Sequence, residues 1–141
     1  MANTFVEALA ASLAGDTRIS GLVTGIWNDT LPDDPTAILP YATFVQADSK
    51  SIGILGGAKW VDHIQVNFEV RAVLAYIASS LAQQLRDYLM APQGSISWAG
   101  GQECGRFLPG NESSELEEGR GIDGGDVWVH RVPVMFTTAR G

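Results

Sequence analysis

The segment from residue 60 to residue 72 alternates between apolar and polar side chains. Its apolar positions are Ile64, Val66, Phe68 and Val70, and the positions between them are His63, Gln65, Asn67, Glu69 and Arg71. Successive side chains of a β-strand point to opposite faces of a sheet, so the pattern predicts a strand with one face on a core and one polar face. Any fold of this chain must bury the first face and leave the second to water or to a partner.

The loop before this strand, residues 49–58, is rich in glycine but also contains Ile52, Ile54 and Leu55. Apolar side chains on such a loop lower solubility unless something outside the fold covers them. Together with an expected strand at residues 41–47, the segment predicts a long β-hairpin. We therefore expect a protein that acts through its surfaces.

Two segments have the helical period. In residues 4–14, Thr4 and Glu7 fit a capping box, and Gly15 suits the end of the helix. Residues 75–91 carry a second apolar stripe, which Pro92 ends; its members are Ile77, Leu81, Leu85, Tyr88 and Leu89. Residues 16–23 predict a short additional helical piece.

The remaining segments predict strands and a loop. Short strands are expected at residues 95–98 and 106–108, a mobile glycine- and glutamate-rich loop at 110–125, and a closing strand at 127–138. Pro133 cannot donate to a strand ladder, which predicts that the closing strand is an edge strand or carries a bulge. The order of elements predicts one α+β domain over residues 1–141: a mainly antiparallel twisted sheet with two amphipathic helices packed on one face.

Composition excludes several classes of protein. Sixteen acidic residues against nine basic ones give a formal charge of −7, which argues against tight binding to phosphate backbones but not against surrounding DNA without holding it. Cys104 is the single cysteine, so no internal disulfide can form. No run approaches the roughly 18 apolar residues of a membrane helix, so we expect no membrane partner.

Motifs with chemical meaning are weak. Residues 119–124 match G-x-G-x-x-G, but the residues that follow predict a strand where a dinucleotide site needs a helix. The acidic residues after position 111 lack EF-hand spacing, and the histidines and cysteine lack zinc-ligand spacing, so neither a metal nor a cofactor is expected. A nucleophile could only be Cys104 with His63 or His130, and the adjacent Glu103 would raise the thiol pKa. We therefore expect that this protein has no enzymatic activity.

Four features resemble the tail terminator family of tailed bacteriophages, also called tail completion or tail-to-head joining proteins. They are an N-terminal amphipathic helix leading to Gly25-Ile26-Trp27, a proline-containing loop ending at residues 39–44, the strand at 63–70 before the helix with residues 81–89, and a closing strand after a Gly-Gly-Asp turn. The resemblance implies a helix-and-sheet structural protein of the virion, located at the head-proximal end of the tail and assembled in the host cytoplasm.

The resemblance also implies partners. The family forms a homo-oligomer, a hexameric ring, on the last ring of the major tail tube protein, stops tube polymerisation and offers a surface to the head connector or neck protein. A compact 141-residue domain is roughly 37 Å across, so six in a ring leave a bore of roughly 35–40 Å and three leave only a few ångströms. Duplex DNA, about 20 Å wide, passes only the larger bore, and an acidic lumen would let it slide without specific binding.

We assign two contact surfaces as hypotheses. Subunit contact is assigned to the polar strand face: His63, Gln65, Asn67, Glu69 and Arg71. Tail-tube contact is assigned to the hairpin tip and its base: Ser51, Ile52, Gly53, Ile54, Leu55 and Trp60. Plain solvation of the strand face is the alternative for any single residue.

Three other readings stay open. The nearest is a head-completion or neck protein, which would share ring geometry but bind the portal side. A small ligand-binding or regulatory module is the second. An enzyme that uses Cys104 or His130 is the third.

Overall fold

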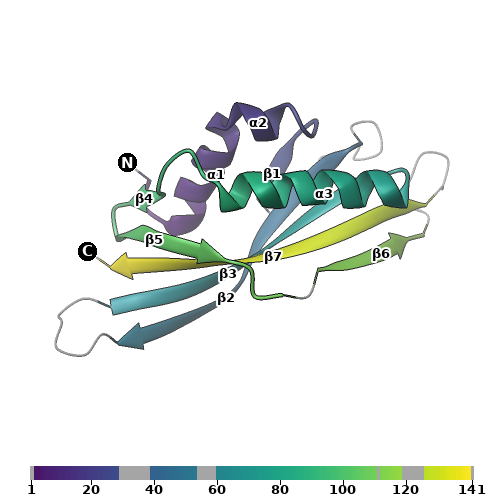
Figure 1. Ribbon diagram of the computed structural model, residues 1–141. Coiled ribbons are helices and arrows are strands. Elements are labelled where there is room, and N and C mark those ends of the chain that lie inside the picture. Colours follow the sequence, from purple (N-terminus) through teal and green to yellow (C-terminus); the bar gives the residue numbers. More distant parts are fainter. Residues whose placement is uncertain (1, 29–38, 54–59, 111, 119–125, 141) are drawn as a thin grey trace.

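The computed structural model describes residues 2–28, 39–53, 60–110, 112–118 and 126–140, with side chains omitted at 48, 50–53 and 60 (Figure 1). The elements in chain order are α1 (Phe5–Gly15), α2 (Thr17–Ser20), β1 (Ile26–Asn28), β2 (Tyr41–Gly53), β3 (Trp60–Ala72), α3 (Ala75–Met90), β4 (Ser97–Trp98), β5 (Gly101–Phe107), β6 (Ser113–Glu117) and β7 (Val127–Arg140). The predicted α+β class is confirmed.

The strands of the described residues form one seven-stranded sheet in the order β1-β2-β3-β7-β5-β4, with β6 also paired to β7. β1 pairs with β2 in parallel, and the other pairs are antiparallel. Helices α1, α2 and α3 lie on one face of this sheet, and the described residues place no helix on the other (Figure 1). The two faces of β3 therefore meet very different surroundings.

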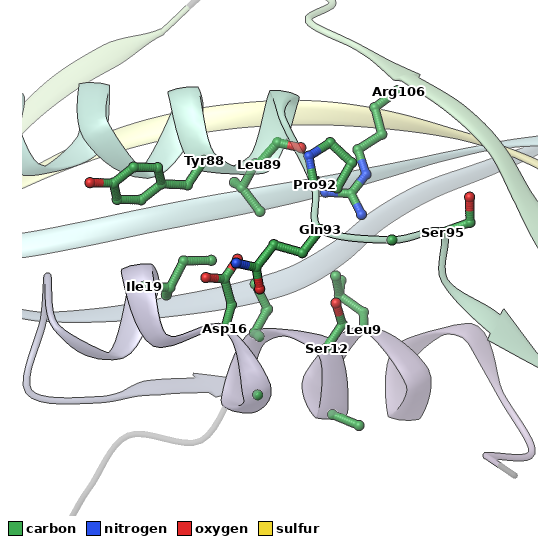
Figure 2. Close-up of a pocket in the computed structure, with 14 residues that line it drawn as sticks. Leu9, Ser12, Asp16, Ile19, Tyr88, Leu89, Pro92, Gln93, Ser95 and Arg106 are labelled. Atoms are coloured by element: carbon green, nitrogen blue, oxygen red, sulfur yellow. Dashed lines mark hydrogen bonds between the residues drawn. The ribbon is translucent and has the colours of Figure 1, made fainter.

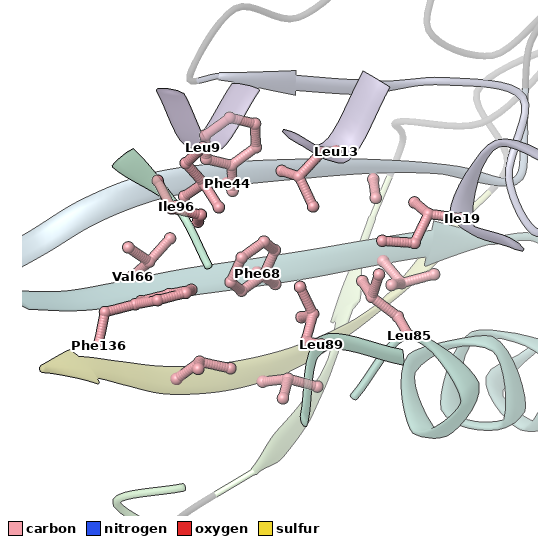
Figure 3. Close-up of a cluster of buried hydrophobic side chains, with 14 of the residues drawn as sticks. Leu9, Leu13, Ile19, Phe44, Val66, Phe68, Leu85, Leu89, Ile96 and Phe136 are labelled. Carbon is pink, nitrogen blue, oxygen red and sulfur yellow. The ribbon is translucent and has the colours of Figure 1, made fainter. Parts of the chain in front are cut away.

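The core lies between the helices and the apolar face of β3. Val66, Phe68 and Val70 are at most 1% exposed, and Leu9 of α1 and Leu85 of α3 are equally buried (Figure 3). Burial of a large apolar side chain stabilises the fold by roughly 2 kcal/mol before entropy is counted. The alternation in the sequence thus identifies the strand that the helices cover.

Helix α1 begins as the sequence predicts. The Thr4 hydroxyl accepts a hydrogen bond from the Glu7 backbone N–H at 3.2 Å. The Glu7 carboxylate accepts one from the N–H of Asn3, one residue before the N-cap. The capping pattern therefore satisfies free backbone donors at the start of the helix. Helix α3 also lies where the apolar stripe predicts it.

Two strand lengths differ from the sequence prediction. β2 continues to Gly53, where residues 48–53 had been assigned to a loop, because its outer half pairs with Trp60–Gln65 of β3 across a bulge between Gln46 and Asp48. β5 begins at Gly101, well before the predicted start at residue 106. In both places pairing with a neighbouring strand outweighs the loop-like local composition.

The prediction of a mobile loop at residues 110–125 is wrong for its central part. Residues 113–117 form β6, which pairs with β7 from Val127 to Arg131. Residues 111 and 119–125, including the whole G-x-G-x-x-G motif, lie outside the described residues.

The prediction that the closing strand lies at an edge, or carries a bulge, is wrong. β7 lies between β3 on one side and β5 and β6 on the other. β6 pairs with β7 only as far as Arg131 and β5 only from Met135, so Pro133 falls in the gap between them. A residue without a backbone N–H fits a central strand at such a gap, because no neighbour on that side requires a donor.

Candidate functional site: the open face of the sheet

The polar side chains of β3 lie on the face that carries no helix, which we call the open face. In register, Gln65 lies opposite Met135, Asn67 opposite Pro133, and Glu69 opposite Arg131 of β7. His63, Gln65, Asn67 and Glu69 are partly exposed, but Arg71 is only 9% exposed. The sequence pattern thus predicts correctly which face these side chains share, and it misses the burial of Arg71.

One half of the open face is a network of alternating charges, which we call the charged half (Glu69, Arg71, Glu115, Glu117 and Arg131). Arg71 Nε lies 2.9 Å from Glu117 Oε1, and Arg131 Nε lies 2.8 Å from Glu69 Oε2. Arg131 also pairs with Glu115. These bonds tie β3, β6 and β7 together within one chain.

Arg71 has the most contacts in the charged half. Its Nη1 donates to the Thr43 hydroxyl at 3.0 Å, and its guanidinium lies 5.9 Å from the centre of the Tyr41 ring. Burial acts to lower the pKa of Arg71, but the hydrogen bond and the charge of Glu117 outweigh burial and raise it. Arg71 therefore stays charged and fixed, so its first role is to hold β2, β3 and β6 together.

The other half of the open face is formed by aromatic, amide and apolar side chains, and we call it the mixed half (His63, Gln65, Asn67, Phe107, Pro133 and Met135). The His63 and Phe107 rings meet edge to face with centroids 5.6 Å apart. Gln65 Nε2 donates to Asn67 Oδ1 at 3.0 Å. A depression of about 270 Å³ opens here, lined by Gln65, Asn67, Pro109, Gly110, Ser113, Arg131 and Pro133.

The predicted tube-contact residues are only partly described. The backbones of Ser51, Ile52 and Gly53 end β2, opposite Asp62, Val61 and Trp60 of β3. Ile54 and Leu55 lie outside the described residues. The assignment of these residues to tube contact stays a prediction.

A second hollow, about 240 Å³, lies on the helix-covered side between α1, the end of α3 and residues 92–95 (Figure 2). Its charged members already have partners: Asp16 is paired with Arg18, and Arg106 with Glu103. Within the described part of the chain, every buried side-chain nitrogen and oxygen has a hydrogen-bond partner. The hollow therefore presents no buried unsatisfied side-chain polar group to a ligand.

Among the described residues, Cys104 and His130 make their contacts with other groups and not with each other. Cys104 is exposed at the bulge of β5, with Sγ 3.9 Å from the carbonyl oxygen of Gln102. His130 instead bonds the Ser114 hydroxyl through Nδ1 at 2.7 Å and lies 3.4 Å from Glu112 through Nε2. His130 is thus half-buried and hydrogen-bonded, whereas Cys104 lies at the surface.

The described residues hold neither a metal-binding cluster nor a membrane-spanning helix. They contain no group of three or more His, Cys, Asp or Glu side chains arranged to hold a metal ion. The acidic residues Glu112, Glu115 and Glu117 are each bonded to an arginine. In the same part of the chain, no helix has the length and apolarity needed to cross a membrane.

The sequence pattern does not predict the exposed apolar residues beside the site. Phe107 and Leu108, at the end of β5, are 42% and 41% exposed. Val73, Leu74 and Tyr76, where β3 leads into α3, are 59%, 45% and 71% exposed. The sequence did contain a signal for the exposure of Tyr76, because this residue lies outside the apolar stripe of its helix.

The fold defines an α+β protein with one covered and one open sheet face. No protein-family model matches the chain, and no curated protein sequence matches it. A chain of the solved structure described as "Virion of native gene transfer agent (GTA) particle" has a similar fold, with a TM-score of 0.61 over 98% of this chain and 98% of that chain. At 18% sequence identity, the similarity shows a shared fold.

Proposed function

We propose that this protein is a structural component of a virion, which acts by contact with other proteins and catalyses no reaction. The observation that carries the proposal is the fold shared over 98% of both chains with a chain of a gene transfer agent virion. The shape of the protein supports it, because one sheet face is free of helices in the described residues and apolar side chains are exposed at two places. Surfaces of this kind suit protein contact.

Within the virion, we propose the role of a tail terminator: a hexameric ring that caps the tail tube, stops tube polymerisation and offers its other side to the head connector. The sequence features that resemble the family support this role. They fall on α1 and β1, on the start of β2, on β3 with α3, and on β7. The sequence features that resemble the family therefore lie in both long helices, α1 and α3, and in the central strands of the sheet.

Tube capping tests the role directly. Purified protein is added to polymerising major tail tube protein of the same virion, and tube lengths are measured by electron microscopy. We expect shorter tubes with protein density at one end. A variant that lacks residues 52–55 should fold, as judged by circular dichroism, and should no longer cap. The matched control is Gln83→Asp, on the exposed side of α3, which should cap normally.

The outcomes separate the alternatives. Capping by the deletion variant would show that the hairpin tip is not the tube contact. Binding to the portal side but not to tubes would favour a head-completion protein. Binding to neither would contradict the virion role, and a rise in melting temperature with a metabolite would then favour a small ligand-binding module.

A further inference from the structure

The exposed large apolar side chains of the described residues fall into two separate groups. We call Val73, Leu74 and Tyr76 the corner patch, and Phe107 and Leu108 the strand-end patch. Solvent-exposed apolar groups that cluster, rather than scatter singly, mark contact surfaces. Two such surfaces on one chain need an explanation.

The two patches cannot cover each other within one copy. Ala72, just before the corner patch, lies opposite Trp128, and Phe107 lies opposite Met135. Seven residues of β7 separate these levels, which is roughly 24 Å along the strand. Tyr76 belongs to a helix on the covered face, whereas Phe107 contacts His63 on the open face. The patches therefore lie at different levels and on opposite faces of the sheet.

We propose that the corner patch of one copy docks on the strand-end patch and the adjoining depression of the next copy, with Tyr76 entering the depression. A closed ring of identical subunits requires a head-to-tail contact between two different surfaces of the chain. Two separated patches at different levels meet that requirement. The inference rests on the proposed ring and names its subunit contact.

The depression suits a tyrosine side chain. It measures about 270 Å³, whereas a cavity of roughly 150 Å³ can hold a benzene ring. Pro109 and Pro133 supply apolar walls, and the amides of Gln65 and Asn67 supply partners for a phenol hydroxyl. The predicted subunit contact on β3 thereby becomes more specific: Gln65 and Asn67 belong to it, while Glu69 and Arg71 serve the internal charge network.

Charge complementarity supports the same occupant. On the open face around β6, three carboxylates (Glu69, Glu115 and Glu117) face two guanidinium groups (Arg71 and Arg131), which leaves one excess negative charge beside the depression. Tyr76 lies in the first turn of α3, which carries no acidic residue and no side-chain cap. The positive end of that helix dipole would therefore approach an acidic surface.

Cysteine trapping tests the contact. In a Cys104→Ser background, Tyr76→Cys and Leu108→Cys are made as separate proteins of different mass, mixed at high concentration and oxidised mildly. We expect mixed disulfide dimers in at least ten-fold excess over dimers of either variant alone. The double variant should give a ladder that ends in a closed ring. The control replaces Tyr76→Cys with Gln83→Cys, about two turns further along the same helix.

A mixed-dimer yield equal to that of the control, or to that of self-dimers, overturns the inference. Tube capping by the Cys104→Ser protein is measured in parallel. Failed trapping with intact capping overturns only this contact. Successful trapping without capping leaves the contact and contradicts the terminator role.

Discussion

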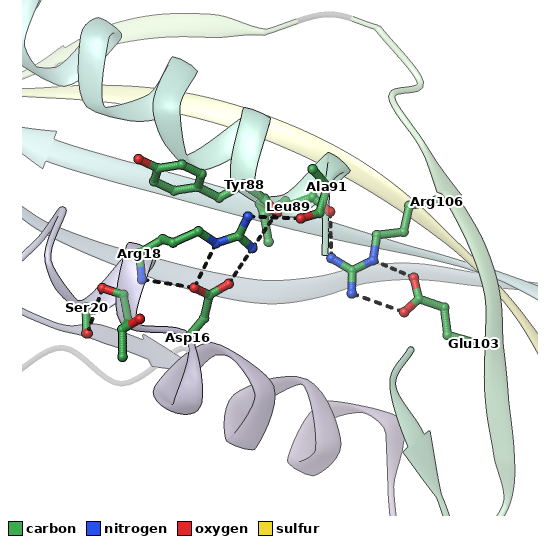
Figure 4. Close-up of polar contacts among 9 residues, drawn as sticks. Asp16, Arg18, Ser20, Tyr88, Leu89, Ala91, Glu103 and Arg106 are labelled. Atoms are coloured by element: carbon green, nitrogen blue, oxygen red, sulfur yellow. Dashed lines mark hydrogen bonds and ion pairs between the residues drawn. The ribbon is translucent and has the colours of Figure 1, made fainter. Parts of the chain in front are cut away.

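Arg106 donates a hydrogen bond of 2.7 Å from Nη1 to the carbonyl oxygen of Leu89, and so joins β5 to the last turn of α3 (Figure 4). Arg18 reaches the same helix end from α2 and donates to the carbonyls of Ala91 and Tyr88. The last carbonyls of a helix have no partner within the helix, and α3 has no basic residue in its own last turn. Two arginines from elsewhere in the chain therefore cap α3 and fix its end over the sheet.

Replacing Arg106 by alanine should strongly destabilise the fold. Glu103 is 3% exposed at its side chain, and Arg106 is 6% exposed, so the substitution leaves a buried carboxylate without its main partner. We expect a loss of about 3–5 kcal/mol in the free energy of unfolding, measured by urea denaturation. Arg106→Leu combined with Glu103→Leu should lose less, because no unpaired charge remains. Equal losses would contradict this account.

Asp16 should make stability depend on pH in the acid range. The hydrogen bond from Arg18 is the largest cause that places the pKa of Asp16 below its ordinary value of 3.8. Because the pKa of Asp16 is lower in the folded state, the stabilisation is fully present well above pH 3.8 and is lost as pH falls from 3.8 through the folded-state pKa. The difference in unfolding free energy between the wild type and Asp16→Asn should therefore shrink between about pH 6 and about pH 3. If the difference in unfolding free energy between the two proteins stays constant with pH, the charge of the Asp16 carboxylate is not the source of the stabilisation.

Arg71 and Arg86 should differ in their importance although both form ion pairs. The Arg71 side chain is 11% exposed and bonds Glu117 and Thr43, whereas Arg86 and its partner Glu112 are 24% and 31% exposed. We expect Arg71→Ala to cost about 3 kcal/mol and Arg86→Ala at most about 1 kcal/mol. Thermal unfolding of the two variants side by side measures the contrast, and similar melting temperatures would refute it.

Two glycines of β5 provide a matched test of close packing. A Cβ at Gly101 would lie 2.6 Å from the carbonyl oxygen of Ala139 and 2.9 Å from the Trp98 ring, whereas a Cβ at Gly105 would meet nothing within 4 Å. Gly101→Ala should therefore lose about 1–3 kcal/mol, since backbone must move. Gly105→Ala should be neutral or slightly stabilising. Urea denaturation compares them, and an unchanged Gly101→Ala protein would mean that β5 can shift freely.

The elements with a strong period were predictable from the sequence. Strict alternation marked β3, and a four-residue stripe marked α3, because each pattern follows from burying one side of a regular element. β6 was missed because Ser113–Glu117 has the composition of a loop. Its strand is supported by Arg71, 46 residues from its partner Glu117, and by Arg131, 16 residues from its partner Glu115.

The location of the candidate site on one sheet face was predictable from the sequence. Which of its side chains form internal ion pairs was not. Alternation placed Gln65, Asn67 and Arg71 on one face. Arg71 is buried beside its partner Glu117, which lies 46 residues further along the chain. A local sequence pattern cannot predict a partner at that distance. Pro133 was misjudged for a related reason, since the gap that accommodates it is made by the ends of two other strands.

The pairing of β3 with β7 has a consequence for synthesis of the chain. Asp62 and Arg140, which bond across this pair, are 78 residues apart. A nascent chain that has completed β2 and β3 must keep one edge of β3 without its neighbour until β7, residues 127–140, has been translated. Such uncovered edges invite association between unfinished chains. We therefore expect expression of this protein to be sensitive to temperature and to chaperones at the stage when β7 joins the sheet.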